Sequence, residues 1–318
     1  MAGGLSRSAP AVFGLLLAQR VALLFALLAA VFVAVELLPG SGARAVLGRE
    51  ASDAEVAAKE HELGLDRPLL VRFGAWISGV LTGDFGATAR GRPIGELLAG
   101  AFPQTLLLGG LALLLTVLGS LLLGAWWALR PGSLLGRALQ PGSSVAAALP
   151  EFVLAVLLVA VFSLLLGWLP AVTVSGRSGF PVRADMLVLP VLALAVPQIG
   201  WNVRVVRAAL ADAAREPHVE TAVLDGLPER VVLLRHVLPF ALPTIVAGFA
   251  TSVGMLLGGA LVVEAVFNYP GVGALLAGSV ADRDAALVAA VVALTAVSVL
   301  AMLAVADAVR AWSVRGRA

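Results

Sequence analysis

Long apolar blocks separated by short polar stretches dominate the chain. A helix needs roughly 20 apolar residues to cross a hydrocarbon core about 30 Å thick, and several blocks reach that length. We count about six such blocks. Their expected ranges are Val21–Leu38, Thr105–Leu129, Val145–Leu166, Leu187–Leu210, Ala241–Val263 and Ala286–Val309. This pattern predicts an all-α polytopic membrane protein.

The N-terminal region precedes the first block with another apolar stretch. Residues Ala11–Gln19 predict a short interfacial helix. Arg7 followed by an apolar run is also typical of a secretory signal. However, the run Val21–Leu38 is longer than the core of a typical signal, no small-residue cleavage site precedes Glu36, and further blocks follow. We therefore expect an uncleaved first span.

The placement of arginine predicts the orientation. Positive residues are enriched in the short cytoplasmic loops of membrane proteins, whereas long loops carry little weight. If the N-terminus is cytoplasmic, the cytoplasmic side holds Arg7, Arg20, Arg130, Arg137, Arg204, Arg207, Arg215, Arg230, Arg235, Arg310, Arg315 and Arg317. The short outer loops then hold only Arg177, Arg183 and Arg283. We therefore expect both termini in the cytoplasm.

A long polar segment, Gly40–Gly100, lies outside in this topology. Ser52 and Glu55 have the spacing of a capping box, in which each side chain bonds the other residue's backbone N–H. The helix that they start is expected to end at Gly64. A second short helix is expected from Pro68 to about Leu81. Such a segment would form a small cap over the outer mouth of a pathway.

A second polar segment, Ala211–Pro239, lies on the cytoplasmic side. Its charges alternate in sign, while Val219, Ala222, Val223 and Leu227 recur at helical spacing. Gly226 and Pro228 are expected to divide it into two short helices, from about Arg215 to Leu224 and after Pro228. A polar helical segment between two spans is suited to docking a soluble partner.

Composition excludes several classes of function. The chain of 318 residues is 60% apolar and 13% charged, with a mean hydropathy of +0.99. It has no cysteine, so disulfides and thiolate chemistry are excluded, and its three histidines lie far apart in sequence. A pI near 9.9 reflects arginines at the ends of apolar blocks rather than a nucleic-acid surface. We find no nucleophile–base pair and no metal-ligand cluster, so we do not expect an enzyme.

Three carboxylates fall within the apolar blocks. Charges inside spans are costly, at about 2.5–3.5 kcal/mol each, and are functional candidates. Glu151 lies near the inner end of the third span, and Glu36 and Glu264 lie near outer ends. Each can also simply reach the membrane surface. Glu264 is the strongest candidate because it opens a polar, glycine-containing run.

The fourth span contains an unusual set of residues. Pro190 and Pro197 each remove a helix hydrogen bond, and Gln198 and Asn202 are close by. They indicate either a kinked helix that lines a pathway or ordinary packing of a tilted span, and the sequence leaves both open.

The cytoplasmic segment resembles the EAA signature of ABC importer permeases. It reads Glu220-Thr221-Ala222, three residues, Gly226, then Leu238-Pro239. In the signature, Glu-Ala-Ala is followed by three residues, Gly, nine residues, Ile, one residue and Leu-Pro. Thr221 here replaces the central Ala, and His236 stands where Ile is usual.

Further runs resemble the dipeptide/oligopeptide/nickel permease family. The run Leu257–Gly273 is similar to its "VVE-x-VF-N-x-PG-x-G" pattern. Three shorter runs resemble landmarks of the family's B-type subunit: Glu62-Leu63-Gly64-Leu65-Asp66-Arg67-Pro68, Gly83-Asp84-Phe85-Gly86 and Gly167-Trp168-Leu169-Pro170. At Leu38-Pro39-Gly40-Ser41-Gly42 the chain departs from the family, which usually has Asp-Pro after that Gly. The resemblance extends from about Val21 to Arg317.

This resemblance implies a type I permease and its partners. A second, similar permease subunit pairs with it, two cytoplasmic ATPases bind the ATP, and an extracytoplasmic solute-binding protein docks above. The EAA segment then forms the coupling helix that enters a cleft in one ATPase. The implied coupling residues are Glu220, Thr221, Ala222, Asp225, Gly226, Leu238 and Pro239. The candidates for the pathway or outer gate are Glu264, Phe267, Asn268, Pro270, Gly271, Pro190, Pro197, Gln198 and Asn202.

The expected organisation has three parts. Residues 1–20 form a cytoplasmic or interfacial segment, residues 21–104 hold the first span and the outer helical segment, and residues 105–318 form a permease core with the coupling segment at 211–239. We expect no cofactor in the chain itself.

Alternative interpretations remain at this point. The charges around Glu220 can be a solvated face, and His236 is expected to pack at a helix junction rather than to bind a ligand. The transported solute can be a peptide, which the absence of clustered histidine and cysteine favours, or a nickel or metal chelate. A stand-alone secondary transporter or channel is the alternative of another class, but such proteins usually carry their polar signature at the midplane.

Overall fold

The structure is a computed structural model that describes residues 9–36, 42–48, 50–62, 64, 66–88, 90–174, 176, 180–282 and 284–315. Several sequence predictions lie outside the described residues. They concern the turn Leu38-Pro39-Gly40, the landmark residues Leu63 and Leu65, and Arg7, Arg177, Arg283 and Arg317.

Helices make up almost all of the described chain. Four are long and apolar enough to cross a membrane: α5 (Ile94–Leu129), residues Ala184–Ala213, residues Glu229–Val266 and the start of α13 (Ala285–Arg315). A fifth candidate is a bent pair, Leu134–Ala148 and Glu151–Leu165. Helix α1 (Ala9–Glu36) contains a shorter apolar stretch, Val21–Ala34, within 28 residues that extend about 42 Å. The all-α polytopic prediction is confirmed.

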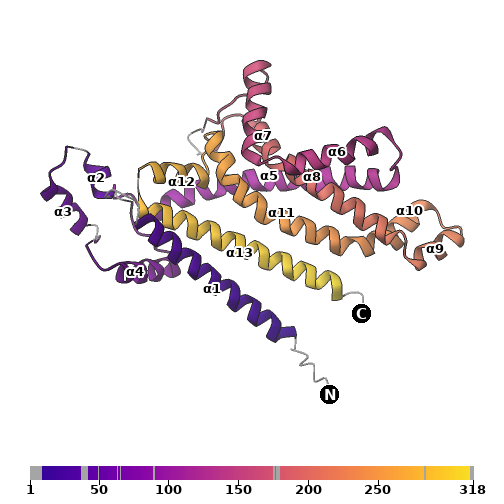
Figure 1. Ribbon diagram of the computed structural model, residues 1–318, viewed down its shortest axis with the longest axis horizontal. Coiled ribbons are helices and arrows are strands. Elements are labelled where there is room, and N and C mark those ends of the chain that lie inside the picture. The colour runs from indigo at the N-terminus through magenta and orange to yellow at the C-terminus, as the bar shows by residue number, and fades with distance from the viewer. Residues whose placement is uncertain are drawn as a thin grey trace. The chain divides into compact units, whose positions relative to one another are not determined.

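The chain divides into two compact units (Figure 1). One holds Met1–Ala99 with Leu275–Leu300, and the other holds Gly100–Ala274 with Ala301–Ala318. The first contains α1 and three short helices, α2 (Gly42–Leu47), α3 (Asp53–Glu62) and α4 (Leu69–Thr82). Helix α12 (Val272–Ala281) runs from the second unit into the first. Its C-terminal end is tied within the first unit by the ion pair between Arg90 and Asp282, at 3.3 Å.

The two short helices that the sequence predicted between Gly40 and Gly100 are confirmed. At the start of α3, the Ser52 N–H donates to Glu55 at 2.9 Å, and the Glu55 N–H donates to Ser52 Oγ at 3.3 Å. The Ser52 side chain and backbone hydrogen bonds lower the pKa of the Glu55 carboxyl, because they favour its charged form. Helix α4 ends at Gly83, whose φ of +82° is a left-handed conformation that glycine adopts without strain. The first glycine of the landmark Gly83-Asp84-Phe85-Gly86 thus has a structural explanation.

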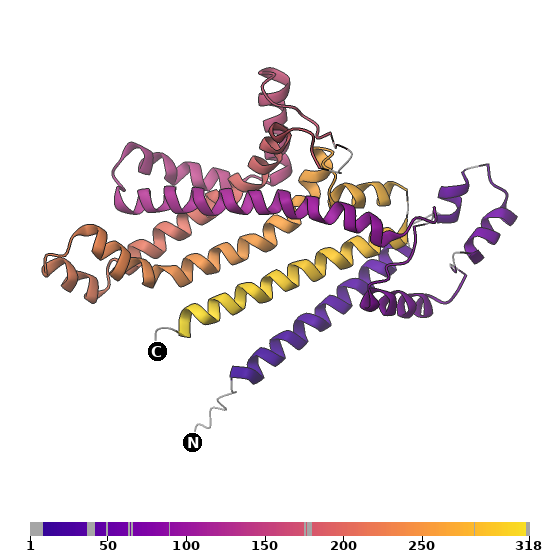
Figure 2. The same ribbon diagram turned by 180° about the vertical axis from the view of Figure 1, so that it is seen from behind.

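Helix α8 (Val188–Ala213) is the centre of the second unit. It packs against α6 (Leu134–Ala148), α7 (Glu151–Leu158) and α11 (Leu238–Val266), and Figure 2 shows this group from behind. Glycine allows two of these close approaches. A Cβ on Gly124 of α5 would lie 2.7 Å from Val206 on α8, and one on Gly200 of α8 would lie 2.8 Å from Ala146 on α6. Small residues let membrane helices approach closely in this way.

The third expected span, Val145–Leu166, is wrong as a continuous helix. Helix α6 ends at Ala148, Leu149 is extended, and Pro150 precedes α7, so the chain turns by 105°. Proline lacks the N–H for a continuous helix and disfavours a helical residue before it, which explains the break. A π-helical turn, Val159–Leu165, follows α7 and ends before Gly167, whose φ is +64°.

Three other boundaries differ from the expectation. Residues Ala11–Gln19 are part of α1 rather than a separate interfacial helix, because Gln19 and Arg20 are good helix formers. Helix α5 begins at Ile94, well before Thr105, and includes Pro103. Pro190 lies in the first turn of α8, where the turn Ala184–Leu187 passes into α-helix, so only Pro197 lies inside that helix.

Candidate functional site

The predicted coupling segment consists of two short helices at the end of α8. Helix α9 (Pro217–Leu224) follows it, with Pro217 at the first position, where a missing N–H has no cost. Helix α10 (Glu229–Val231) and a π-helical turn, Val232–Val237, then lead directly into α11. The division that the sequence predicted between the two helices is confirmed.

Gly226 ends α9 with a Schellman turn. Its φ is +73°, its N–H donates to the Val223 carbonyl at 3.0 Å, and the Leu227 N–H donates to the Ala222 carbonyl at 3.2 Å. Pro228 follows in an extended conformation and starts α10. The glycine of the signature is thus required by the backbone rather than by a side-chain contact.

Helix α9 has a buried face and an exposed face. Val219 and Ala222 are buried in an apolar cluster that joins α8, α9 and α11; its other members are Val206, Ala209, Leu210, Ala213, Val232, Val237, Ala241 and Ile245. Leu224, on the opposite side of the helix, is 80% exposed, and Val223, at the edge of the buried face, is 59% exposed although its spacing grouped it with Val219. One face therefore fixes α9 to two long helices, and the other presents large apolar side chains to the surroundings.

The exposed face of α9 also carries the acidic residues of the signature. Glu220 and Asp225 are exposed, and among the described residues neither forms an ion pair within 4 Å. Thr221 is exposed as well, and its hydroxyl donates to the Pro217 carbonyl at 3.0 Å. Threonine can thus replace the usual alanine, because its polar group is satisfied within α9.

The last two residues of the EAA-like signature lie at the start of α11. Leu238 is the first residue of that helix and is half-buried, and Pro239 occupies its first turn. His218 on α9 lies nearby, and its Nε2 is 2.9 Å from the His236 carbonyl oxygen. The His218 ring also stacks on Phe240 of α11 at 4.2 Å. The structure therefore brings together two histidines that are distant in sequence, and the contact fixes α9 to the start of α11.

His236 takes part through its backbone, in agreement with its expected place at a helix junction. Its ring lies 6.4 Å from that of His218. In the described part of the chain, no group of three His, Asp or Glu side chains is placed to hold a metal.

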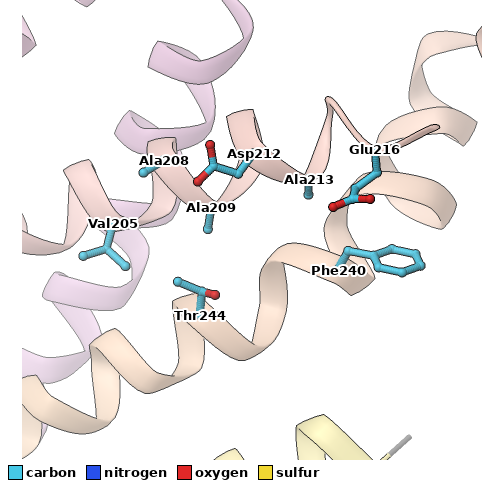
Figure 3. A pocket seen from close by; sticks show the side chains of 8 residues that line it. All are labelled: Val205, Ala208, Ala209, Asp212, Ala213, Glu216, Phe240 and Thr244. Atoms are coloured by element: carbon cyan, nitrogen blue, oxygen red, sulfur yellow. The ribbon is translucent and has the colours of Figure 1, made fainter. Parts of the chain in front are cut away.

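A groove of about 380 Å³ opens beside the coupling segment (Figure 3). Val205, Ala208, Ala209, Asp212, Ala213 and Glu216 line it from the α8 side, and Phe240 and Thr244 line it from α11. The carboxylates of Asp212 and Glu216 lie on one side of it, and both residues are exposed. The groove lies between the C-terminal end of α8 and the start of α11, next to the apolar cluster in which these helices pack with α9.

A second candidate site surrounds Glu264 at the opposite end of α11. Glu264 is fully buried, so the alternative that it simply reaches the membrane surface is wrong. Its Oε2 accepts a hydrogen bond from the Gly273 N–H, at the start of α12, at 2.6 Å. The carboxylate therefore closes the turn between α11 and α12 from inside.

Two glycines make room for this carboxylate. A Cβ on Gly271 would lie 2.3 Å from the Glu264 carboxyl group, and a Cβ on Gly273 would lie 2.2 Å from the Leu261 carbonyl oxygen. Any side chain at either position would push α12 away from α11. The glycines of the family run thus have a packing explanation.

Buried residues anchor the same turn to the start of α5. The Tyr269 hydroxyl donates to the Gln104 carbonyl at 3.0 Å, and the Val272 N–H donates to Thr105 Oγ1 at 2.9 Å. The Phe267 carbonyl accepts from the Thr173 N–H at 2.9 Å, and Phe267 is 1% exposed. Hydrogen bonds thus hold the turn to α5 and to the segment of Thr173.

Asn268 and Pro270 shape this turn without joining its buried network. Asn268 is exposed and has a φ of +48°, a left-handed conformation that asparagine tolerates better than most residues. Pro270 is half-buried in the bend before α12. Of the predicted outer-gate residues, Glu264, Phe267 and Gly271 lie inside the turn and these two lie at its surface.

The predicted pathway residues of α8 lie in the helix interior of the second unit. Pro190, Pro197, Gln198 and Asn202 are all buried. The Asn202 amide donates to Ser252 on α11 at 2.6 Å and to the Gln198 carbonyl at 2.8 Å. This arrangement favours the packing interpretation of the span over the one in which it lines a pathway.

Sequence reasoning missed several residues of both sites. Gln104, Thr105 and Tyr269 anchor the turn at Glu264, and His218 fixes α9 to α11. Tyr269 is the only tyrosine in the chain and falls inside the family run, which was a usable signal. The roles of the others depend on contacts across more than a hundred residues, or across eighteen for His218, and no local pattern encodes them.

The chain matches two family models. The binding-protein-dependent transport system inner membrane component matches residues 120–318, and the N-terminal domain of such membrane components matches residues 15–93. The glutathione transport system permease protein GsiC of Salmonella paratyphi A is 36% identical over 281 residues, which cover 87% of this chain and 89% of that protein. A probable peptide ABC transporter permease protein, y4tP of Sinorhizobium fredii, is 32% identical over 83% of this chain and 85% of its own length.

Solved structures show the same fold. The inward-facing MetNI methionine ABC transporter aligns with a TM-score of 0.56 and 18% identity, over 69% of this chain and 96% of that chain. An amino acid ABC transporter crystallised with histidines aligns with a TM-score of 0.51 and 19% identity, over 68% and 93%. The chain therefore belongs to the binding-protein-dependent inner membrane permeases, and it is an ABC importer permease of the peptide family.

Proposed function

We propose that this chain is one of two permease subunits of an ATP-driven peptide importer and that α9 is its coupling helix. The second permease is similar in sequence, two ATPases bind on the cytoplasmic side and supply the ATP site, and a solute-binding protein delivers the peptide from outside. Relatives whose names specify glutathione and peptides support this class of solute. Both termini are cytoplasmic in this arrangement.

The observation that carries the proposal is the two-sided surface of α9. Its exposed face combines Glu220 with Val223 and Leu224, and large exposed apolar side chains next to a charge are typical of a protein interface. Its opposite face is buried against α8 and α11. A force that a partner applies to α9 would therefore reach both long helices.

Helix α11 gives this force a route to the other side of the membrane. It is a continuous helix of 29 residues, about 44 Å long. It starts beside α9 and ends at the turn of Glu264, where Phe267, Asn268, Pro270 and Gly271 follow. We infer that this turn belongs to the outer gate and that it moves as a unit with α11.

The test is transport by the reconstituted complex. Proteoliposomes would contain both permeases and both ATPases, with the binding protein outside. Uptake of labelled short peptides and of a labelled nickel chelate would be measured. We expect ATP-dependent uptake of peptide, with ATP hydrolysis stimulated by the peptide-loaded binding protein. If only the nickel chelate is taken up, the proposed substrate class is wrong. Peptide uptake without ATP would contradict the proposal that the complex is an ATP-driven importer.

A further inference from the structure

Helix α4 presents an uncharged, largely apolar surface within the outer segment of the chain. Leu70 is 81%, Val71 is 55% and Leu81 is 76% exposed, and no residue of the helix is fully buried. Its remaining exposed residues are Gly74, Ala75, Ser78 and Thr82. Such a continuous surface is unusual for a helix in water and indicates that something covers it.

The neighbouring helix α3 provides the comparison. It belongs to the same outer segment, and charged side chains such as Asp53, Glu55 and Glu62 cover its surface. Helix α4 has 14 residues and a single charge, Arg72, whose guanidinium lies over the Phe32 ring at 6.0 Å. The two helices therefore present different surfaces, a charged one on α3 and a largely apolar one on α4.

The polar side chains on the exposed face of α4 are satisfied within the helix. The Ser78 hydroxyl donates to the Ala75 carbonyl at 2.8 Å. The Thr82 hydroxyl donates to the Gly79 carbonyl at 2.9 Å and lies 3.2 Å from the Ser78 carbonyl oxygen. Lipid offers no partner to a hydroxyl, and these internal bonds leave neither side chain in need of one.

The other face of α4 fixes its position along α1. Phe32 of α1 contacts Phe73 and Trp76 of α4, with ring centroids 5.4 Å and 5.8 Å apart. Phe32 lies one helical turn, about 6 Å, before the end of α1 at Glu36. Both ribbon views show α4 beside this end of α1 (Figures 1 and 2). Helix α4 is thus placed at the depth where a membrane span ends.

We propose that α4 lies in the bilayer, in the interfacial layer of the outer leaflet, with Leu70, Val71 and Leu81 among the lipid chains. Its 14 residues extend about 21 Å, too little to cross the membrane. Exposed side chains of α1, among them Leu23 and Leu27, are apolar as well, as expected of a helix that faces lipid. The outer segment is then anchored to lipid through α4 and extends into water through α3.

The absence of native cysteine allows a direct test with single nitroxide labels. The variants Leu70→Cys and Leu81→Cys would be labelled in the full complex, reconstituted in nanodiscs of phosphatidylethanolamine and phosphatidylglycerol. Leu23→Cys on α1 serves as the lipid-exposed control, and Ala58→Cys on α3 as the water-exposed control. Paramagnetic resonance would report how often each label collides with oxygen, which concentrates in lipid, and with a water-soluble nickel complex.

We expect the ratio of oxygen to nickel collisions at positions 70 and 81 to be several-fold above that at 58 and close to that at 23. A ratio equal to that of the Ala58→Cys label would place α4 in water and overturn the proposal. Low collision rates with both reagents would also overturn it, because they would show that a protein partner covers this face.

Discussion

Replacing Gly226 with proline is expected to abolish the association of the ATPases while the permease still inserts into the membrane. Proline fixes φ near −65°, whereas Gly226 has a φ of +73° and donates its N–H to Val223. Proline also disfavours the helical conformation of Asp225 before it. Because α9 has only eight residues, loss of its last turn would remove the surface formed by Val223 and Leu224.

The measurement is the amount of ATPase that co-purifies with a tagged permease. Gly226→Asn is the matched control, because asparagine tolerates a positive φ and should keep the turn and the partner. If the same amount of ATPase co-purifies with the Gly226→Pro permease at equal membrane levels, α9 is not part of the interface with the ATPase.

A charge reversal at Glu220 tests the same surface through a side chain, and we expect Glu220→Lys to lose the ATPases as well. Glu220 is exposed, so the substitution leaves the fold of α9 unchanged and alters only what a partner meets. Glu50→Lys, an equally exposed reversal in the outer segment, should have no effect. If the ATPases co-purify at wild-type levels with both the Glu220→Lys and the Glu50→Lys permease, Glu220 belongs to a solvated face and not to an interface.

Replacing Gly273 with alanine is expected to destabilise the turn at Glu264 severely. The new Cβ would lie 2.2 Å from the Leu261 carbonyl oxygen and 2.5 Å from its Cα, both backbone atoms of α11 that cannot rotate away. Overpacking of this kind costs about 1–3 kcal/mol. The forced shift would also break the hydrogen bond to the buried Glu264 carboxylate, at a further cost of about 1–3 kcal/mol. The measurement is the midpoint of thermal unfolding of the complex in nanodiscs.

Gly278 of the same helix supplies the control. A Cβ there meets nothing within 4 Å, and alanine is more favourable than glycine inside a helix by about 0.5–1 kcal/mol. We therefore expect Gly278→Ala to unfold at the same temperature as the wild type or slightly above it. Equal midpoints for Gly273→Ala and Gly278→Ala would contradict the packing described for the turn.

The sequence predicted those parts of the fold whose signals are local. The capping box at Ser52 and Glu55 starts α3, and the pair Gly226 and Pro228 separates α9 from α10, because each of these residues acts on its immediate neighbours. The sequence could not predict how sharply the chain turns at Pro150. Apolar residues on both sides resemble one span, and a proline is tolerated inside helices in other places, as Pro103 and Pro197 are here.

The candidate sites show the same limit. The motif runs identified Glu264, Gly271 and the predicted coupling residues as candidates, but the surroundings of these residues depend on partners distant in the sequence. Whether Glu264 reaches the membrane surface or is buried is decided by Gly273 and by the anchors on α5. The hydrophobic pattern carries no information on such contacts, because a glutamate is the same residue in the sequence whether the fold buries it or exposes it.

The central claim is that α9 docks on the ATPase, and a photo-crosslink tests it most directly. In the transporting complex, a benzophenone amino acid would replace Leu224, which is 80% exposed on α9. The control would carry it in place of Val182, which is 54% exposed in an expected outer loop. The account predicts that illumination joins position 224 to an ATPase subunit and that position 182 yields no such product. An ATPase adduct at position 182, or none at position 224, would contradict it.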